Sequence, residues 1–229
     1  MLLQLFLVPS FLTFAMANFF APSDNANAAL GPQLQPWYPE SDFKTFGSGL
    51  DVSKYTPEGQ QFDVKKVSVA FLAEYYKKNP DSLTYRDGYE DPDLGVKHAW
   101  VEQTHDGIKF ANTDGKVTFN RFNKVVTVSS SYVTLTTAPI TLLKATLTLE
   151  EAIKVAEEAL RGTYVPPTSP SASATSDDKS SLQFLANADG SATLVYSVPV
   201  KNDSQGTYFQ AYVDAHEPKI VAATDYVAH

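Results

Sequence analysis

Four histidines are the side chains of this chain best suited to metal binding or proton transfer: His98, His105, His216 and His229. A hydrolytic zinc site needs histidine or carboxylate ligands at fixed spacing, and the sequence contains no His-Glu-x-x-His. His98 and His105 stand seven residues apart across a predicted hairpin. We therefore expect surface or turn histidines, with no metal site and no cofactor of the chain's own.

Patterns for other catalytic chemistry are also missing. The sequence has no Gly-x-Ser-x-Gly elbow, no Gly-x-Gly-x-x-Gly and no P-loop, and Gly47-Ser48-Gly49 predicts only a flexible turn. With no cysteine, thiol catalysis, disulfides and Cys-ligated metal centres are excluded. Glu150, Glu151, Glu157 and Glu158 have the spacing of a solvated helix face. The residues themselves predict no catalytic site and a protein that is not an enzyme.

Charge narrows the classes of partner. The 229 residues include 18 Lys and Arg against 26 Asp and Glu, a formal net charge of −8. A chain this acidic is poorly suited to a phosphate backbone, so we expect no nucleic-acid partner. Apolar residues make up 43% of the chain, enough for a packed core.

The N-terminal residues predict secretion. Residues 2–14 are mostly apolar and are followed by small-residue sites at 15–17 and 26–28, so we assign residues 1–28 to a signal peptide. The stretch is too short and interrupted for a stable membrane span, although an N-terminal anchor or a buried segment is the alternative. Asn202-Asp203-Ser204 in a polar turn predicts N-glycosylation at Asn202, as in a secreted glycoprotein.

Two α+β units follow from the hydrophobic periodicity. In residues 29–145, a helix begins near Asp63 and ends at Asn79-Pro80, an Asp- and Gly-rich loop covers 87–95, and an antiparallel meander follows. Its expected strands are 97–104, 108–110, 117–119, 125–128 and 132–136, with a tight turn at Asp106-Gly107.

The second unit is residues 146–229. Thr148-Leu149-Glu150-Glu151 is a capping box that opens an amphipathic helix, which Gly162 is expected to end. A Pro/Ser/Thr-rich insertion at 166–181 precedes strands at 182–186, 192–200, 207–214 and 220–226. Trp100, Tyr208, Tyr212 and Tyr226 are expected mainly as core or cross-strand aromatics. The fold class is therefore α+β, two small units each with a helix on an antiparallel sheet.

Two stretches resemble the pro-regions of fungalysin and thermolysin zymogens. Residues 98–108, continuing to Asn112-Thr113-Asp114, resemble the fungalysin/thermolysin propeptide (FTP) domain, and 189–196 with 208–227 are similar to the PepSY-like unit that closes such pro-regions. Gly31-Pro32-x-Leu34 also matches their N-terminal approach. The residues carrying the resemblance are Gln103, Gly107, Asn112, Asp114, Tyr212 and Asp214. Two departures are Phe122-Asn123-Lys124 and Glu217-Pro218-Lys219, where the family has glycine-containing turns; Asn123 can replace glycine in a left-handed conformation.

The resemblance implies cystatin-like and PepSY-like units that fold on their own, assist folding of a zinc metallopeptidase and cover its cleft. It implies a fungalysin-type catalytic domain as partner, with zinc held only by that partner. We expect an inhibitory tail of Asp225, Tyr226, Val227, Ala228 and His229, with the terminal carboxylate or imidazole replacing the zinc-bound water.

Three functions remain open from the sequence. The first is a secreted inhibitor or folding assistant of a fungalysin-type peptidase. The second is a truncated or processed precursor of an extracellular metalloproteinase, and the third is a secreted binding or cell-surface module without a protease partner.

Overall fold

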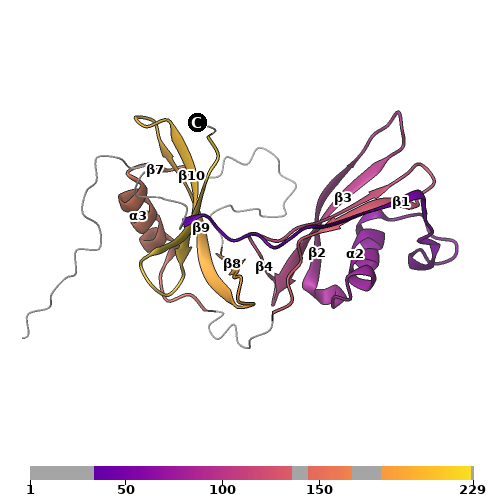
Figure 1. Cartoon of the computed structure of the whole chain (residues 1–229), viewed down its shortest axis with the longest axis horizontal. Coiled ribbons are helices and arrows are strands. Elements are labelled where there is room, and N and C mark those ends of the chain that lie inside the picture. Colours follow the sequence, from indigo (N-terminus) through magenta and orange to yellow (C-terminus); the bar gives the residue numbers. More distant parts are fainter. Residues whose placement is uncertain (1–33, 136–143, 167–181, 228–229) are drawn as a thin grey trace, which may run out of the picture.

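The computed structural model describes residues 34–135, 144–166 and 182–227. Within these ranges the chain forms two helix-on-sheet units joined side to side (Figure 1). The expected signal peptide at 1–28 and the core of the expected insertion, 167–181, lie outside the described residues. No helix of the described residues is long and apolar enough to cross a membrane.

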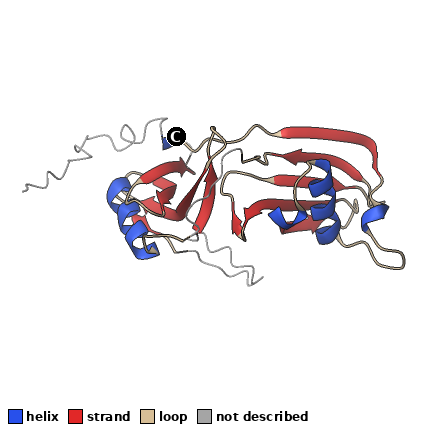
Figure 2. Ribbon diagram, turned by 90° about the horizontal axis from the view of Figure 1, so that it is seen from below, coloured by secondary structure: helices blue, strands red, loops and turns tan. Residues whose placement is uncertain are grey.

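The first unit is an antiparallel sheet with one long helix, α2, on one face (Figure 2). The strand order is β1-β6-β5-β3-β2, and the short β4 pairs with β3. The bounds are β1 Asp42–Leu50, α2 Val64–Tyr75, β2 Leu83–Glu90, β3 Lys97–His105, β4 Ile108–Lys109, β5 Gly115–Phe119 and β6 Val125–Ser130, with one-turn helices at Ser53–Tyr55 and Pro80–Ser82.

Alternation along β3 explains why the helix covers that face. Ala99 and Val101 are fully buried and pack with Phe71 and Leu72 of α2, whereas His98 and Trp100 lie on the opposite face. The helix begins where expected, since the Asp63 carboxylate accepts hydrogen bonds from the Lys65 and Lys66 amides at 3.0 and 3.3 Å.

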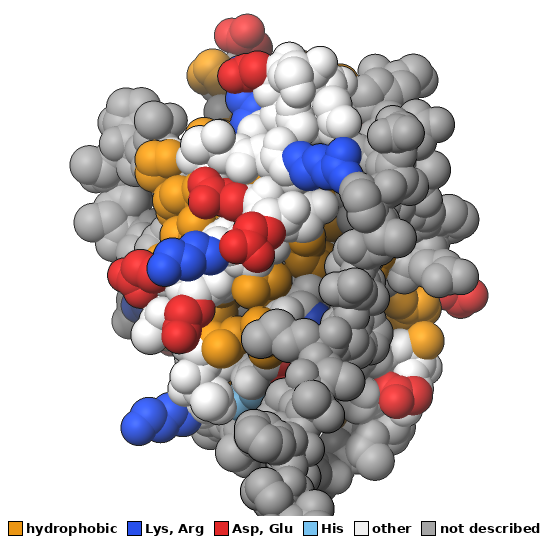
Figure 3. Space-filling view, turned by 90° about the vertical axis from the view of Figure 1, so that its left-hand side faces the viewer, with side chains coloured by type: hydrophobic (Ala, Val, Ile, Leu, Met, Phe, Trp, Pro, Cys, Tyr) orange, Lys and Arg blue, Asp and Glu red, His pale blue; other side chains and the backbone are white. Residues whose placement is uncertain are grey.

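The second unit repeats this construction. Its sheet has the order β11-β10-β9-β7, with β8 also paired to β9, and α3 packs on one face. The bounds are α3 Leu149–Leu160, β7 Thr163–Tyr164, β8 Leu182–Ala186, β9 Ala192–Asn202, β10 Thr207–Asp214 and β11 Ile220–Asp225. Figure 3 shows the outer side of this unit, where charges of both signs are interspersed with hydrophobic side chains.

Both units confirm the predicted α+β class, and local signals were accurate. The Thr148–Glu151 capping box is present, and Asn123 has the left-handed φ of 58° that its replacement of glycine required. The left-handed residue that ends α3 is Arg161 rather than Gly162. Gly162 is needed for another reason, because a Cβ there would lie 2.6 Å from the Lys201 carbonyl oxygen of β9.

Three strand expectations were wrong. Residues 132–135 form no strand, although a β-branched run predicted one. The expected loop at 87–95 begins inside β2, and β1 with its Gly47-Ser48-Gly49 segment was not anticipated as a strand. Gly47 and Gly49 have φ of 51° and 100° where the β1–β6 register shifts, so this segment is a β-bulge.

The two units share a junction made by distant parts of the chain. A bridging segment, residues 34–41, runs from beside the second sheet to β1 (Figure 1). Phe110, just after β4, pairs with Phe184 of β8, and the Ala111 amide donates to the Phe184 carbonyl at 2.7 Å. Phe110 is buried within the core of the second unit, so the units are packed together there.

Candidate functional site

The expected inhibitory tail leaves the molecule at the end of β11. The Tyr226 amide donates to the Tyr208 carbonyl at 2.9 Å, and the Val227 amide donates to Asp225 Oδ1 at 3.0 Å. The first bond holds Tyr226 to β10, and the second holds Val227 to the last residue of β11. Ala228 and His229, the end of the predicted tail, lie outside the described residues.

Aromatic side chains surround this exit. The rings of Tyr208 and Tyr226 lie 6.0 Å apart, and the hydroxyls of Tyr38 and Thr224 lie 3.3 Å apart. Tyr226 is 61% exposed and Tyr38 is 55% exposed. Partial burial, with Tyr38 and Tyr208 nearby, raises the pKa of Tyr226, so its hydroxyl stays neutral. We call Tyr38, Tyr208, Tyr226 and Val227 the tail-exit surface.

Tyr212 is not part of that exposed surface. It is buried with Leu185, Val195 and Ala222 on the sheet face opposite α3. Burial is the main reason that the pKa of the Tyr212 hydroxyl lies above its usual value. Tyr212 is therefore a core residue of the second unit.

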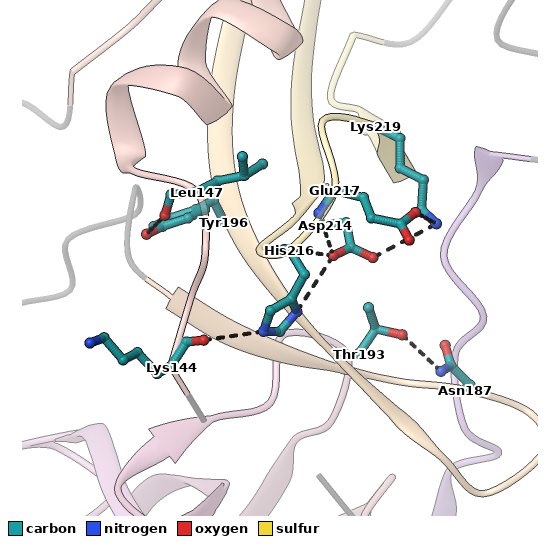
Figure 4. Close-up of polar contacts among 9 residues, drawn as sticks. All are labelled: Lys144, Leu147, Asn187, Thr193, Tyr196, Asp214, His216, Glu217 and Lys219. Carbon is teal, nitrogen blue, oxygen red and sulfur yellow. Dashed lines mark hydrogen bonds and ion pairs between the residues drawn. The ribbon is translucent and has the colours of Figure 1, made fainter. Parts of the chain in front are cut away.

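Asp214 organises the turn between β10 and β11 (Figure 4). Its Oδ1 accepts hydrogen bonds from the His216 and Glu217 amides at 2.8 and 3.2 Å. Lys219 Nζ lies 4.0 Å from the second carboxylate oxygen, and the His216 ring also reaches the Lys144 carbonyl at 3.2 Å. The Asp214 side chain therefore stabilises the turn between β10 and β11.

Gln103 holds the segment that was expected to be a strand. Its Nε2 donates to the Val133 carbonyl at 2.9 Å, and its Oε1 accepts from the Val133 amide at 2.9 Å. Gly107 has a φ of 78° and forms the β3–β4 turn together with Asp106, as predicted. Both residues act by shaping the backbone.

Asn112 lies at the centre of the junction and is only 5% exposed. Its Nδ2 donates to the Trp37 and Ala186 carbonyls at 2.7 and 2.8 Å, and its Oδ1 accepts from the Ala186 amide at 2.9 Å. One side chain therefore joins the first unit, the bridging segment and β8.

Asp114 lies near the same junction. Its carboxylate is 3.4 Å from Arg86 Nη1, and its amide donates to the Ser131 hydroxyl at 2.9 Å. Burial raises the pKa of Asp114, and the neighbouring Arg86 only partly offsets that effect. The sequence did not single out Arg86, which lies between Asp87, Glu102 and Asp114.

Asn202, the predicted glycosylation acceptor, lies at the end of β9 beside the β9–β10 turn. The side chain is 7% exposed, and its Nδ2 donates to the Arg161 carbonyl at 2.7 Å. Its Oδ1 accepts from the Ser204 hydroxyl and the Gln205 amide. A glycan on Nδ2 must displace these contacts, and glycosylation at Asn202 stays a prediction.

Among the described residues, no three His, Asp or Glu side chains are grouped to hold a metal ion. The six motif residues instead divide into core, turn and junction positions. The sequence did not predict that the bridging segment contacts both units. The feature that could have indicated it is Trp37-Tyr38, two large aromatic residues in an otherwise polar, Pro-rich stretch.

Comparisons with known proteins gave one family match, and it lies in the first unit. Residues 81–132 match the family model "Fungalysin/Thermolysin Propeptide Motif". A search of curated proteins gave no match. Among solved structures, the chain is similar to the Bacillus megaterium YpeB C-terminal domain, with a TM-score of 0.39, 10% identity and coverage of 76% of this chain and 69% of that one.

A second structural neighbour is the protein CD1622 from Clostridium difficile 630, with a TM-score of 0.26, 13% identity and coverage of 75% and 99% of the two chains. Both TM-scores are below 0.5, so the fold description rests on the chain's own elements. Gln103, Gly107, Asn112 and Asp114 lie inside the matched residues 81–132. The first unit of this chain is therefore similar to the fungalysin/thermolysin propeptide motif over residues 81–132.

Proposed function

We propose that this chain is a secreted, non-catalytic pro-region that binds the catalytic domain of a fungalysin-type zinc metallopeptidase, inhibits it and assists its folding. The observation that carries this proposal is the propeptide motif at residues 81–132, built on β2 to β6. The zinc belongs to the partner in this proposal, and the chain contributes surface.

The tail-exit surface is the part of the molecule that we assign to the peptidase cleft. Tyr226 and Val227 are exposed, yet the Tyr226 amide is bonded to β10 and the Val227 amide to the Asp225 carboxylate of β11, so little conformational entropy is lost when a partner covers them. Exposed tyrosines with an apolar ring and a polar hydroxyl are typical of protein interfaces.

The decisive experiment titrates the full chain into a mature fungalysin-type metallopeptidase while cleavage of a peptide substrate is followed. We expect dose-dependent loss of activity. A parallel assay follows the yield of active peptidase when the denatured catalytic domain refolds with and without the chain. Full peptidase activity in excess chain, together with an unchanged refolding yield, contradicts the proposal.

Variants locate the contact. Tyr226→Ala, and separately deletion of residues 227–229, are expected to weaken inhibition by about tenfold or more, the loss typical of a central interface aromatic. Tyr89→Ala is the matched control, because Tyr89 is 57% exposed but lies on β2 of the other unit. Equal inhibition by all three proteins removes the tail-exit surface from the mechanism. Retention on cell-wall material without peptidase binding favours the surface-module alternative.

A further inference from the structure

A groove of about 630 Å³ runs along α2 beside the start of β2, in the first unit and away from the tail-exit surface. Its floor is apolar and is formed by Val69, Ala70 and Ala73 of the helix together with Pro80 and the ring of Tyr85. Val69 and Ala70 remain partly exposed, so α2 does not bury this side against its own sheet. The groove is open along its length, which suits a chain segment better than an enclosed small molecule.

Strand β2 forms one side of this groove. It is the last strand in the order β1-β6-β5-β3-β2, and within the described residues no strand pairs with its outer edge. An edge strand presents backbone N–H and C=O groups that an added strand can pair with. Tyr85 pairs with the buried Val101, so its side chain points to the α2 side of the sheet. A strand added to β2 places alternate side chains on that same side, into the groove.

The rim of the groove is positively charged, although the chain as a whole carries −8. Lys65, Lys66 and Lys78 line it with a single acid, Glu74, and that acid is paired with Lys54. Lys65 Nζ lies 5.4 Å from the centre of the Tyr85 ring, directly over the floor. Lys78 Nζ is held by the Val133 carbonyl at 2.7 Å, which keeps its charge at the groove end.

Besides burial, two carboxylates outside the lining, those of Asp87 and Asp63, lie near enough to contribute to the raised pKa of Tyr85. Asp63 accepts the Lys65 and Lys66 amides at the helix N-terminus, and Asp87 lies 3.6 Å from Arg86. Like charges along the groove favour an occupant of opposite sign.

We infer that the groove between α2 and β2 binds an extended acidic peptide segment of a partner protein, which adds to the edge of β2 as a further strand. Every second side chain of the segment faces the groove, and among these the apolar ones lie on Val69, Ala70 and Tyr85 while the carboxylates face Lys65 and Lys66. A peptide is favoured over an anionic membrane surface because the apolar groups are recessed beside a strand edge rather than projecting from the molecule. The inference is independent of the proposed peptidase inhibition.

The test uses the full chain and a labelled peptide in which every second residue is valine or glutamate in turn, with threonine between them, so that valines and glutamates lie on the same face of the strand. Binding by fluorescence anisotropy is expected to weaken as salt is raised, because exposed charges are screened. The double variant Lys65→Glu, Lys66→Glu is expected to weaken binding by about tenfold or more. The matched control is Lys124→Glu, Lys154→Glu, which makes the same change in net charge at exposed sites outside the groove and is expected to bind normally.

Further arms separate strand addition from simple charge attraction. A peptide of the same sequence with alternate backbone nitrogens methylated keeps its charge but cannot pair with β2, and it is expected not to bind. Ala70→Trp fills the floor and is expected to abolish binding, while circular dichroism checks that the variant folds. Amide chemical shifts on adding the peptide are expected to move for β2 residues such as Thr84 and Arg86.

Three results overturn the inference. The first is undetectable binding of the alternating peptide, or equal affinity for the methylated peptide. The second is capture of the chain by vesicles of anionic lipid, lost in the Lys65/Lys66 variant, without peptide binding. The third is a concentration-dependent dimer that Ala70→Trp dissociates, since a second copy then occupies the groove.

Discussion

Asn112 and Ala186 exchange two hydrogen bonds across the boundary between the two units. Asn112 Nδ2 donates to the Ala186 carbonyl at 2.8 Å, and the Ala186 amide donates to Asn112 Oδ1 at 2.9 Å. The Asn112 side chain thus makes the two hydrogen bonds with Ala186 that the backbone of a paired strand residue would make. The same amide reaches Trp37 of the bridging segment, so three parts of the chain depend on one buried side chain.

Replacing this residue should weaken the junction. Asn112→Ala leaves buried backbone groups of Ala186 and Trp37 without partners, and we expect a loss of about 3 kcal/mol in the free energy of unfolding. Urea denaturation measures it. Asn112→Asp keeps the acceptor but turns a charge toward two carbonyl oxygens, so it should be no more stable than the alanine variant. Thr84→Ala, exposed on β2, is the control. Wild-type stability of Asn112→Ala means that the junction is not held by this side chain.

Val133 should be protected from hydrogen exchange although it lies in no strand. Val133 and Thr134 both lie in irregular chain, but the Val133 amide donates a hydrogen bond to Gln103 Oε1. In Gln103→Leu, amide exchange at Val133 should accelerate by about tenfold or more, since the bond that closes it is gone. Exchange monitored by NMR makes the comparison, with amides of α3 as internal controls. Equally slow exchange in the variant contradicts this role of Gln103.

The capping box of α3 predicts a modest, pH-dependent effect. Thr148→Ala should cost about 1 kcal/mol near neutral pH. The Thr148 amide and hydroxyl, bonded to the Glu151 carboxylate, hold the pKa of Glu151 below its usual value. A lowered carboxyl pKa contributes stability that is present above the unfolded-state pKa and is lost as pH falls through the folded-state value.

Thermal denaturation over a range of pH tests this effect. The gap between wild type and Thr148→Ala should narrow in acid. Thr146→Ala, exposed two residues earlier, should leave stability unchanged. A constant gap at all pH values argues against the Glu151 contribution.

His98 should resist protonation in the folded protein. Burial, and secondarily the charge of Lys116, lowers the pKa of His98 from 6.5. Its Nδ1 lies 3.0 Å from the Thr118 hydroxyl, and its ring centre lies 4.7 Å from that of Tyr89 and 6.3 Å from that of Trp100. Because the unfolded chain binds this proton more readily, stability should fall as pH drops below the unfolded-state pKa.

NMR titration of the His98 ring protons measures this pKa directly. Lys116→Gln should move the pKa upward, because it removes the nearby positive charge. Lys154→Gln, on α3 of the other unit, should not move it. A His98 pKa at or above the ordinary value in wild type contradicts the expectation.

Local signals made some elements predictable from sequence. The capping box of Thr148 and Glu151 predicts the start of helix α3. The alternation of Ala99 and Val101 with the residues between them predicts strand β3. These features are encoded within a few residues, where side-chain spacing determines both the element and its buried face.

The edge strands and the junction between the units could not be predicted from such local signals. β1 is exposed along most of its length and interrupted by the bulge at Gly47 and Gly49, so it lacks an alternating apolar pattern, and its partner β6 is far away in sequence. The second half of β2 was predicted as a loop because it is exposed and also lacks an alternating apolar pattern. Asn112 was singled out by family resemblance, but its bonds to Ala186 depend on tertiary packing.

The bridging segment also bears on how this chain is synthesised. Tyr38 meets Thr224, 186 residues later, and Asn112 meets Trp37 and Ala186 from opposite directions in the chain. A ribosome delivers the first of these partners long before the last. The first sheet can close once β6 has emerged, but the bridging segment must wait for β11 before both of its sides are covered. Final docking of the two units therefore follows the synthesis of β11, and until then Trp37 and Tyr38 are available to chaperones.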